Sequence, residues 1–512
     1  MDATTWQVIA LAIYFVAMIA IGLWANSKNT SLDDYVLGGR QLSPTVAALS
    51  AGAADMSGWL LMGLPGAVYI TGLSESWIAI GLTIGAWCNW KFIAPRLRSY
   101  TEVSGNAVTV PVFLSNRLRD KRKLLRIFSG LIILIFFTFY VSSGMVAGGK
   151  FFESSFNQDF HTGMLLVAGI TVFYTLFGGF MGASYTDMVQ GILMVTALLA
   201  VPVVALINLG DMGSVTESIA HANPNAINLF AASGGIVGII SAAAWGLGYF
   251  GQPHIIVRFM AMRTPKDATS GRRIGISWML LTVIGAISTA FVGIAYFAKH
   301  PEVSLTDAKS AESVFLDLSQ LLFHPFIAGM ILAAVLAAIM STLSSQLVVC
   351  SSALIEDLYG VFSSRKLTAN QSLWLGRAGV ALVAIVAAIL AWNPDSSILQ
   401  LVAFAWAGFG SAFGPTVILS LYWRKLTLQG ALSSMVVGAL VAFFWGQSKE
   451  LHSAMYEMVP AFFSAFAVAV IVSLATYKPN AEIDEEFSLA VELARTGKTL
   501  DDIQASEPAA AK

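Results

Sequence analysis

The chain has 512 residues, of which 56% are hydrophobic and 12% are charged, and its net charge is −1. Soluble proteins carry about 25% charged residues, so this chain has too little polar material to cover a water-facing surface. The small net charge excludes a bulk attraction to nucleic acid. The two cysteines, Cys88 and Cys350, lack the spacing of a disulfide framework or a metal site. The composition therefore predicts a membrane protein with many spanning helices.

Apolar windows of roughly twenty residues mark spanning helices. The stretch from Met1 to Asn26 lacks the basic start of a cleavable leader, so we expect a retained first span there. Thirteen windows occur, at about 5–25, 43–71, 76–94, 125–149, 162–179, 184–208, 229–255, 274–298, 321–356, 372–392, 397–421, 428–446 and 457–477. Two of them, 43–71 and 321–356, exceed what a straight span needs, which indicates tilted or broken helices.

Basic residues are distributed unevenly over alternate loops. With thirteen spans, 25 of the 29 lysines and arginines fall on one side of the membrane and 4 on the other. Because cytoplasmic loops are enriched in Lys and Arg, we expect an outside amino terminus and a cytoplasmic carboxyl tail. The tail, residues 478–512, is acidic at its start and long enough for one amphipathic helix. It is too short for a catalytic or signalling domain.

Two windows are interrupted by residues that weaken helices. One interruption is Asp55-Met56-Ser57-Gly58, and the other is residues 245–253, which hold three glycines, one proline and three aromatic residues. Irregular backbone at membrane depth is tolerated where it lines a cavity or is buried in protein. A lone glycine would indicate only close helix packing, but matched breaks in inverted repeats point to a transporter binding site.

The two breaks lie five spans apart, and an odd block length inverts the second block relative to the first. The expected organisation is a first helix and loop, two five-helix repeats, two further spans and a tail. The corresponding ranges are 1–42, 43–208, 229–421, 428–477 and 478–512.

Span nine carries a row of hydroxyl side chains. Ala338, Ser341, Thr342 and Ser345 follow the spacing of a single helix face. Such hydroxyls usually bond back to carbonyls of their own helix, but four hydroxyls between residues 341 and 345 exceed what this needs. Hard cations prefer oxygen ligands, and neutral oxygens can release a monovalent ion in every cycle. This face, with carbonyls freed at the span-two break, predicts a cation site.

Two carboxylates and one histidine lie in or near core spans. Asp55 is the only charged residue between Ser43 and Leu73, and an intramembrane carboxylate is a functional hypothesis by default. Asp187 falls near the expected cytoplasmic mouth of span six, where a water-exposed helix-end acid is an equally good interpretation. We expect His254 to pack in the interior. No Lys or Arg is expected deep in a core span, which predicts solute recognition by backbone and hydroxyl groups without a salt bridge.

Several long motifs resemble the bacterial sodium/solute symporter family, and within it the members that carry proline. They are SAGAADMSGWLLMGLPGAVY, GLSESWIAIGLTIGAWCNW, FGGFMGASYTDMVQG, AWGLGYFGQPHIIVRFMA and LAAIMSTLSSQLVVCSSAL. The resemblance runs from span one through span thirteen. It implies an all-α membrane protein with a leucine-transporter-type 5+5 inverted repeat, one helix before it and two after it.

The resemblance also implies an activity. We expect sodium-coupled import of L-proline by alternating access across the bacterial inner membrane, with sodium as coupling ion, no other cofactor and no nucleic-acid partner. Another small solute, such as pantothenate or a different organic anion, is the alternative within the family. An enzyme is not expected, because no nucleophile–base pair or metal-spaced His/Cys set is present. A channel would need a continuous polar pore, whereas the polar residues here cluster at the breaks.

Site residues follow from matching family positions. The sodium ligands would be the carbonyls of Ala53, Met56 and Ala338 and the hydroxyls of Ser341 and Thr342. Asp55 would be linked to sodium dependence without being a certain ligand. Proline contacts would fall on Ser57, Gly58, Trp59, Tyr140, Trp245, Tyr249 and Pro253. Some relatives bind a second sodium through an acid and two hydroxyls that match Asp187, Ser344 and Ser345, and the residue types here leave that site open.

Overall fold

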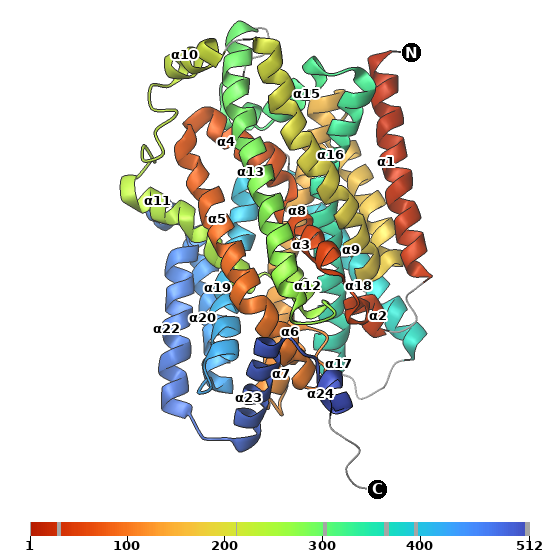
Figure 1. The fold of residues 1–512 in the computed structure, drawn as a ribbon, viewed down its shortest axis with the longest axis vertical. Helices are drawn as coiled ribbons and strands as arrows, with labels where there is room; N and C mark the ends of the chain where they lie inside the picture. Colours follow the sequence, from red (N-terminus) through yellow and green to blue (C-terminus); the bar gives the residue numbers. More distant parts are fainter. Residues whose placement is uncertain are drawn as a thin grey trace.

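The computed structural model describes residues 2–27, 32–210, 212–300, 305–362, 368–393 and 398–506. Four of the basic residues used for the topology, Lys28, Arg365, Lys366 and Lys512, lie outside these ranges. Within them the chain forms helices that run mostly along one axis. Helix α1 begins at one end of this bundle, and α23 and α24 lie at the other (Figure 1).

The first half of the chain contains these elements: α1 (Ala3–Asn26), α2 (Leu32–Leu37), η1 (Gly38–Arg40), α3 (Pro44–Gly58), η2 (Trp59–Gly63), α4 (Leu64–Thr71), η3 (Leu73–Glu75), α5 (Ser76–Cys88), η4 (Asn89–Ile93), α6 (Ala94–Val103), α7 (Val110–Arg117), α8 (Leu124–Phe156), α9 (Phe160–Leu209) and α10 (Met212–Ala222).

The second half contains α11 (Gly235–Ala243), η5 (Ala244–Gly251), α12 (Pro253–Met260), α13 (Asp267–Lys299), α14 (Ala308–Ala311), α15 (Val314–Leu322), α16 (Pro325–Ser352), η6 (Ala353–Tyr359), α17 (Gly360–Phe362), α18 (Ala369–Leu390), α19 (Ile398–Tyr422), α20 (Leu428–Gln447), α21 (Lys449–Ala454), α22 (Met458–Thr476), α23 (Ala481–Thr496) and α24 (Leu500–Ser506).

Each apolar window coincides with a helix or an interrupted helix. Nine helices in the described part are long and apolar enough to cross a membrane. This group omits three windows, each divided among several elements: 43–71 among α3, η2 and α4, 76–94 among α5, η4 and α6, and 229–255 among α11, η5 and α12. The tail also forms an amphipathic helix, α23, as the sequence predicts.

Windows 162–179 and 184–208 are not separated by a loop, which differs from the expectation of two separate helices. Both belong to α9, whose 50 residues are interrupted only at Gly179, with φ 57° and ψ −154°. At about 1.5 Å per residue such a helix is about 75 Å long, more than twice the roughly 30 Å of a bilayer core. Glycine permits this left-handed conformation, so one residue turns the helix without a loop.

Helix α16 is the centre of the molecule. It packs against α1, α3, α8 and α9, and 83% of its most apolar window is buried. Helices α1, α18, α20 and α22 lie at the periphery and bury only a third of theirs. The hydroxyl face of α16 is therefore enclosed by protein, whereas apolar side chains of the peripheral helices face outward.

Candidate functional site

The first break lies at Ser57, where φ is 48° and ψ is −168°. A positive φ is uncommon for a residue other than glycine, and here it interrupts the backbone ladder between α3 and η2. The Trp59 N–H donates to the Ser57 hydroxyl at 3.2 Å, so the side chain supplies an acceptor near the disrupted turn. The sequence prediction of a break at residues 55–58 is confirmed.

The second break comprises η5 and the extended residue Gln252 between α11 and α12. Its backbone carbonyls are used by neighbouring side chains. Asn89 Nδ2 donates to the Tyr249 carbonyl at 3.0 Å, and the Trp406 indole N–H donates to the Trp245 carbonyl at 2.8 Å. These bonds satisfy groups that a regular helix would have paired, as irregular backbone at membrane depth requires.

Helices α3 and α16 meet at Ser341. The Ser341 hydroxyl lies 2.8 Å from the Ala53 carbonyl and 3.1 Å from the Ala338 carbonyl. Thr342 Oγ1 lies 3.2 Å from the same Ala338 carbonyl. Four of the five oxygens expected around sodium are thus joined by hydrogen bonds. The fifth, the Met56 carbonyl, accepts the N–H of Trp59.

The carboxylate of Asp55 faces the second break. The Tyr249 hydroxyl donates to Asp55 Oδ2, and the Tyr140 hydroxyl lies 3.5 Å from the Asp55 carbonyl oxygen. The carboxylate therefore links the two broken spans. Because this carboxylate accepts a hydrogen bond from Tyr249 of the other broken span, it fits the expected role of Asp55 in holding the broken helix in shape.

A small inner cavity lies beside this contact, with room for about one water molecule. It is lined by Asp55, Met56, Ser57, Trp59, Leu82, Tyr140, Trp245, Val402 and Trp406. Four predicted solute contacts, Ser57, Trp59, Tyr140 and Trp245, thus share one cavity. To admit a solute, their aromatic rings must move apart.

The three other predicted solute contacts lie elsewhere. Tyr249 lines a neighbouring cavity that also contains Asp55 and Met56. A Cβ at Gly58 would lie 3.2 Å from Ala147 and from Ile339, so this glycine lets α3 pack against α8 and α16. Pro253 borders a separate cavity with Asp357.

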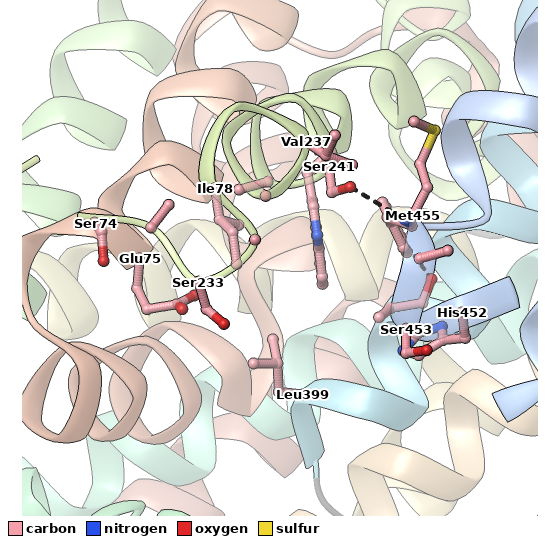
Figure 2. A pocket seen from close by; sticks show the side chains of 18 of the residues that line it. Ser74, Glu75, Ile78, Ser233, Val237, Ser241, Leu399, His452, Ser453 and Met455 are labelled. Atoms are coloured by element: carbon pink, nitrogen blue, oxygen red, sulfur yellow. Dashed lines mark hydrogen bonds between the residues drawn. The ribbon is translucent and has the colours of Figure 1, made fainter. Parts of the chain in front are cut away.

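A wider outer cavity lies beside α11 and the segment between α20 and α22 (Figure 2). Glu75, Ser233, Ser241 and Leu399 are among the side chains that face it. Trp245 lines both the outer and the inner cavity. Its ring stacks between Tyr456, at 5.5 Å, and Trp59, at 6.1 Å. These stacked rings form a partition between the two cavities.

Asp187 is enclosed by protein, so the alternative interpretation as a water-exposed helix-end acid is wrong. It is 0% exposed, and its Oδ2 atom accepts hydrogen bonds from Ser50 at 2.8 Å, Arg258 at 3.0 Å and Ser345 at 3.2 Å. Arg258 also donates to Ser345 and to the His254 carbonyl. Burial of a carboxylate requires a partner of this kind.

Arg258 is a buried basic side chain that the sequence did not lead us to expect. It belongs to α12, the second part of the broken span seven, and its side chain is 1% exposed. Its guanidinium lies beside Asp187 and Ser345, which are two of the three residues of the possible second sodium site. Ser344 instead donates to the Ser341 carbonyl at 3.1 Å. His254 is buried, as expected, with its ring against Phe137 and Tyr140.

Comparisons with known proteins agree with this architecture. The sequence profile of the sodium:solute symporter family matches residues 35–438. The chain belongs to this family. It is 51% identical to the high-affinity proline transporter of Bacillus subtilis over 92% of this chain and 98% of that protein. It is 47% identical to the sodium/proline symporter of Escherichia coli over 96% and 97% of the two chains.

Two solved structures share the fold of this family member. A Na⁺-coupled sialic acid symporter in a substrate-bound, outward-open state has a TM-score of 0.78 and 18% identity, covering 93% of this chain and 99% of that one. A nucleobase-cation-symport-1 family transporter in a closed conformation has a TM-score of 0.51 and 12% identity, covering 90% and 99%. At these identities the likeness concerns the fold alone.

The sequence reading missed several residues at the centre of this symporter. Ser50 and Arg258 complete the Asp187 cluster, Trp406 closes the inner cavity, and Asn89 bonds the second break. Ser50 is a polar residue five positions before Asp55 in a mostly apolar span, and this pattern could have marked it as a candidate site residue. Arg258 follows His254 by one helical turn, and that spacing indicates a shared face. Trp406 and Asn89 carry no comparable signal.

Proposed function

We propose that this symporter imports L-proline together with sodium and has no enzymatic activity. The observation that carries the proposal is the meeting of Ala53, Ala338 and Ser341 beside a cavity walled by aromatic rings. An ion site next to a solute site allows each ligand to raise the affinity of the other by the same factor. Relatives at 47–51% identity are named for proline transport.

The proposed sodium ligands are the carbonyls of Ala53, Met56 and Ala338 and the hydroxyls of Ser341 and Thr342. All are uncharged oxygens of the kind that a hard cation accepts. A sodium ion would replace the hydrogen bonds by which Ser341 now joins the two helices. Because its ligands come from α3 and α16, the ion would hold these helices together, and its departure would release them.

The proposed proline site is the inner cavity, after its aromatic walls have separated. Trp59, Tyr140 and Trp245 offer apolar faces to the ring, and their π faces suit a cationic amine. N–H groups at the breaks suit the carboxylate. Among the described residues that line this cavity, Asp55 is the only charged one, which supports recognition without an arginine or lysine. Gly58, Tyr249 and Pro253 would take part once the site has opened.

We further propose thirteen spans, with α9 counted as two and each interrupted window as one. The inverted repeats would be residues 43–208 and 229–421, arranged as in leucine-transporter-type proteins, with the first span at 1–42, two further spans at 428–477 and a tail at 478–512. The amino terminus would face outside and the tail the cytoplasm of a bacterial inner membrane. Asp187, Ser344 and Ser345 would hold a second sodium only if Arg258 moved away.

The test is uptake of labelled proline by the purified full chain in liposomes under an imposed sodium gradient. We expect sodium-dependent uptake that unlabelled proline abolishes and pantothenate does not affect. Uptake driven by protons and indifferent to sodium would refute the coupling ion. Competition by pantothenate and not by proline would refute the solute.

A further inference from the structure

A pocket with an excess of basic side chains lies at the tail end of the bundle, away from the transport site. We call it the basic pocket. It is lined by Arg119, Lys121, Lys123 and Arg126, with the amide of Asn116 and the hydroxyl of Ser115 between them. Two acids, Asp120 and Glu486, also border it. Helices α6, α7 and α23 gather at this end of the molecule (Figure 1).

An oxyanion already occupies part of the basic pocket. Glu486, on the tail helix α23, accepts two hydrogen bonds from the Arg119 guanidinium, at 2.8 and 3.2 Å. Such a two-point contact is how arginine recognises carboxylate and phosphate groups alike. The tail carboxylate therefore marks the place where a mobile anion would bind.

The other charged groups of the pocket differ in whether they form hydrogen bonds within the protein. Asp120 accepts the N–H of Leu125 at 2.7 Å, Lys123 donates to the Gly360 carbonyl at 3.1 Å, and Arg126 donates to the Glu356 carbonyl. Lys121 is exposed and has no hydrogen bond or ion pair within the described part of the chain. Arg126 also lies 3.8 Å from the Asp357 carboxylate and 3.9 Å from that of Glu356, and Arg119 lies 3.5 Å from that of Glu482. Within the described part of the chain, the positive charges of the pocket that no carboxylate pairs are therefore those of Lys121 and Lys123.

The position of the pocket distinguishes a lipid from a soluble anion. Lys123 immediately precedes α8, and Phe128, Leu131 and Ile135 of that helix are 38%, 45% and 49% exposed. These three residues lie on one helix face, which begins about one and a half turns after Lys123 and lies on the side of α8 away from Arg126. Lipid acyl chains would cover that face while their headgroup phosphate lies at the depth of the basic pocket. Clusters of basic residues at the membrane surface attract anionic lipids.

We propose that the basic pocket binds the phosphate group of an anionic glycerophospholipid, and that Glu486 of the tail competes with this phosphate for Arg119. The tail then docks fully only where the anionic lipid is scarce. This inference is independent of the solute and of the coupling ion.

The test is a titration of the detergent-purified full chain, followed by native mass spectrometry. The probes are short-chain phosphatidylglycerol, short-chain phosphatidylcholine and inorganic phosphate. We expect saturable binding of phosphatidylglycerol and none of phosphatidylcholine. Because each basic residue near a membrane surface contributes about 1 kcal/mol, Lys121→Gln with Lys123→Gln should weaken binding roughly 30-fold.

Two variants provide controls. Arg122→Gln removes one charge from the same basic run outside the pocket and should leave the affinity unchanged, whereas Glu486→Gln should raise it several-fold. Inorganic phosphate binding as tightly as the lipid would overturn the lipid assignment. Equal weakening by Arg122→Gln, or no gain from Glu486→Gln, would overturn the pocket or the competition. Melting temperatures near that of the unchanged chain verify that each variant is folded.

Discussion

At the scale of single residues, Ser341 and Arg258 carry the contacts between helices of the core. Ser341 joins two carbonyls from α3 and α16 through one hydroxyl. Arg258 joins α12 to α9 and α16 through Asp187 and Ser345. Both side chains are enclosed, so water cannot replace the oxygen or the charge that either supplies.

Substitution of Ser341 by alanine should weaken sodium binding. We expect the sodium concentration for half-maximal uptake to rise about 5- to 30-fold, because a lost oxygen partner costs about 1–2 kcal/mol. Uptake by liposomes as a function of sodium measures this change. Ser352→Ala is the matched control, since the only bond of that hydroxyl among the described residues goes to the Val348 carbonyl of its own helix, at 2.9 Å. An equal effect of both variants would count against the site.

Substitution of Asp187 by asparagine should destabilise the fold more than it alters solute affinity. It leaves the buried guanidinium of Arg258 without its counter-charge, which costs about 3–5 kcal/mol. We expect a clearly lower melting temperature in detergent, largely restored by adding Arg258→Gln. Ser345→Ala removes one neutral donor and should cost only about 1 kcal/mol. Additive losses in the double variant would show that the two side chains do not act as a pair.

At the scale of elements, the two broken spans are tied together at the tail end of the bundle. Leu42, just before α3, pairs with the segment after α12: its N–H donates to the Ala261 carbonyl at 3.1 Å. Arg40 donates to the Met260 carbonyl at 2.6 Å, and Arg98 to the Met262 carbonyl at 2.6 Å. The bonds of Leu42 and Arg40 fix the segment before α3 to the end of α12, and the Arg98 bond fixes α6 to the same segment.

The crossing of α5 with η5 depends on glycines that lie in direct contact. A Cβ at Gly85 would lie 2.1 Å from the Gly246 carbonyl oxygen, so Gly85→Ala must push the broken span aside. We expect little folded protein in the membrane, measured by fluorescence-detected size exclusion. Gly169→Ala is the control, because nothing lies within 4 Å of its Cβ. A normal yield of Gly85→Ala would mean that the crossing can adapt.

At the scale of the whole molecule, the orientation in the membrane follows from the charge of the two ends. The helices around the basic pocket and the tail lie at one end, whereas α1 begins at the other (Figure 1). Because positive charge concentrates on cytoplasmic loops, the proposed orientation places the tail end in the cytoplasm. In that orientation, the stacked rings around Trp245 would lie between the solute site and the outside.

Cysteine labelling of intact cells tests this orientation. In a chain whose free thiols, Cys88 and Cys350, have been replaced, Gln158→Cys should react with an impermeant maleimide. Lys121→Cys should react only after the cells are opened. Both positions are exposed, so accessibility within the protein does not limit the reaction. The reverse pattern would invert the topology.

Much of this architecture could be predicted from apolar windows and helix breakers, because bilayer thickness and backbone hydrogen bonding constrain both. The breaks near Ser57 and at residues 245–253 were predictable for that reason. The burial of Arg258 was not, because a basic residue at the edge of an apolar window looks like a loop residue. Its partner Asp187 lies 71 positions earlier, and no local pattern connects them.

The arginine beside Asp187 also bears on how strongly the cell could concentrate its solute. A guanidinium is part of the protein and does not cross the membrane, whereas a bound sodium ion does. If Arg258 keeps its place throughout the cycle, one imported charge accompanies each solute molecule. A potential of 100 mV then contributes about 2.3 kcal/mol, a roughly 50-fold accumulation. If a second cation crossed with each solute molecule, the potential would contribute the square of that accumulation ratio. The fixed charge of Arg258 would thus limit how much the membrane potential adds to solute accumulation.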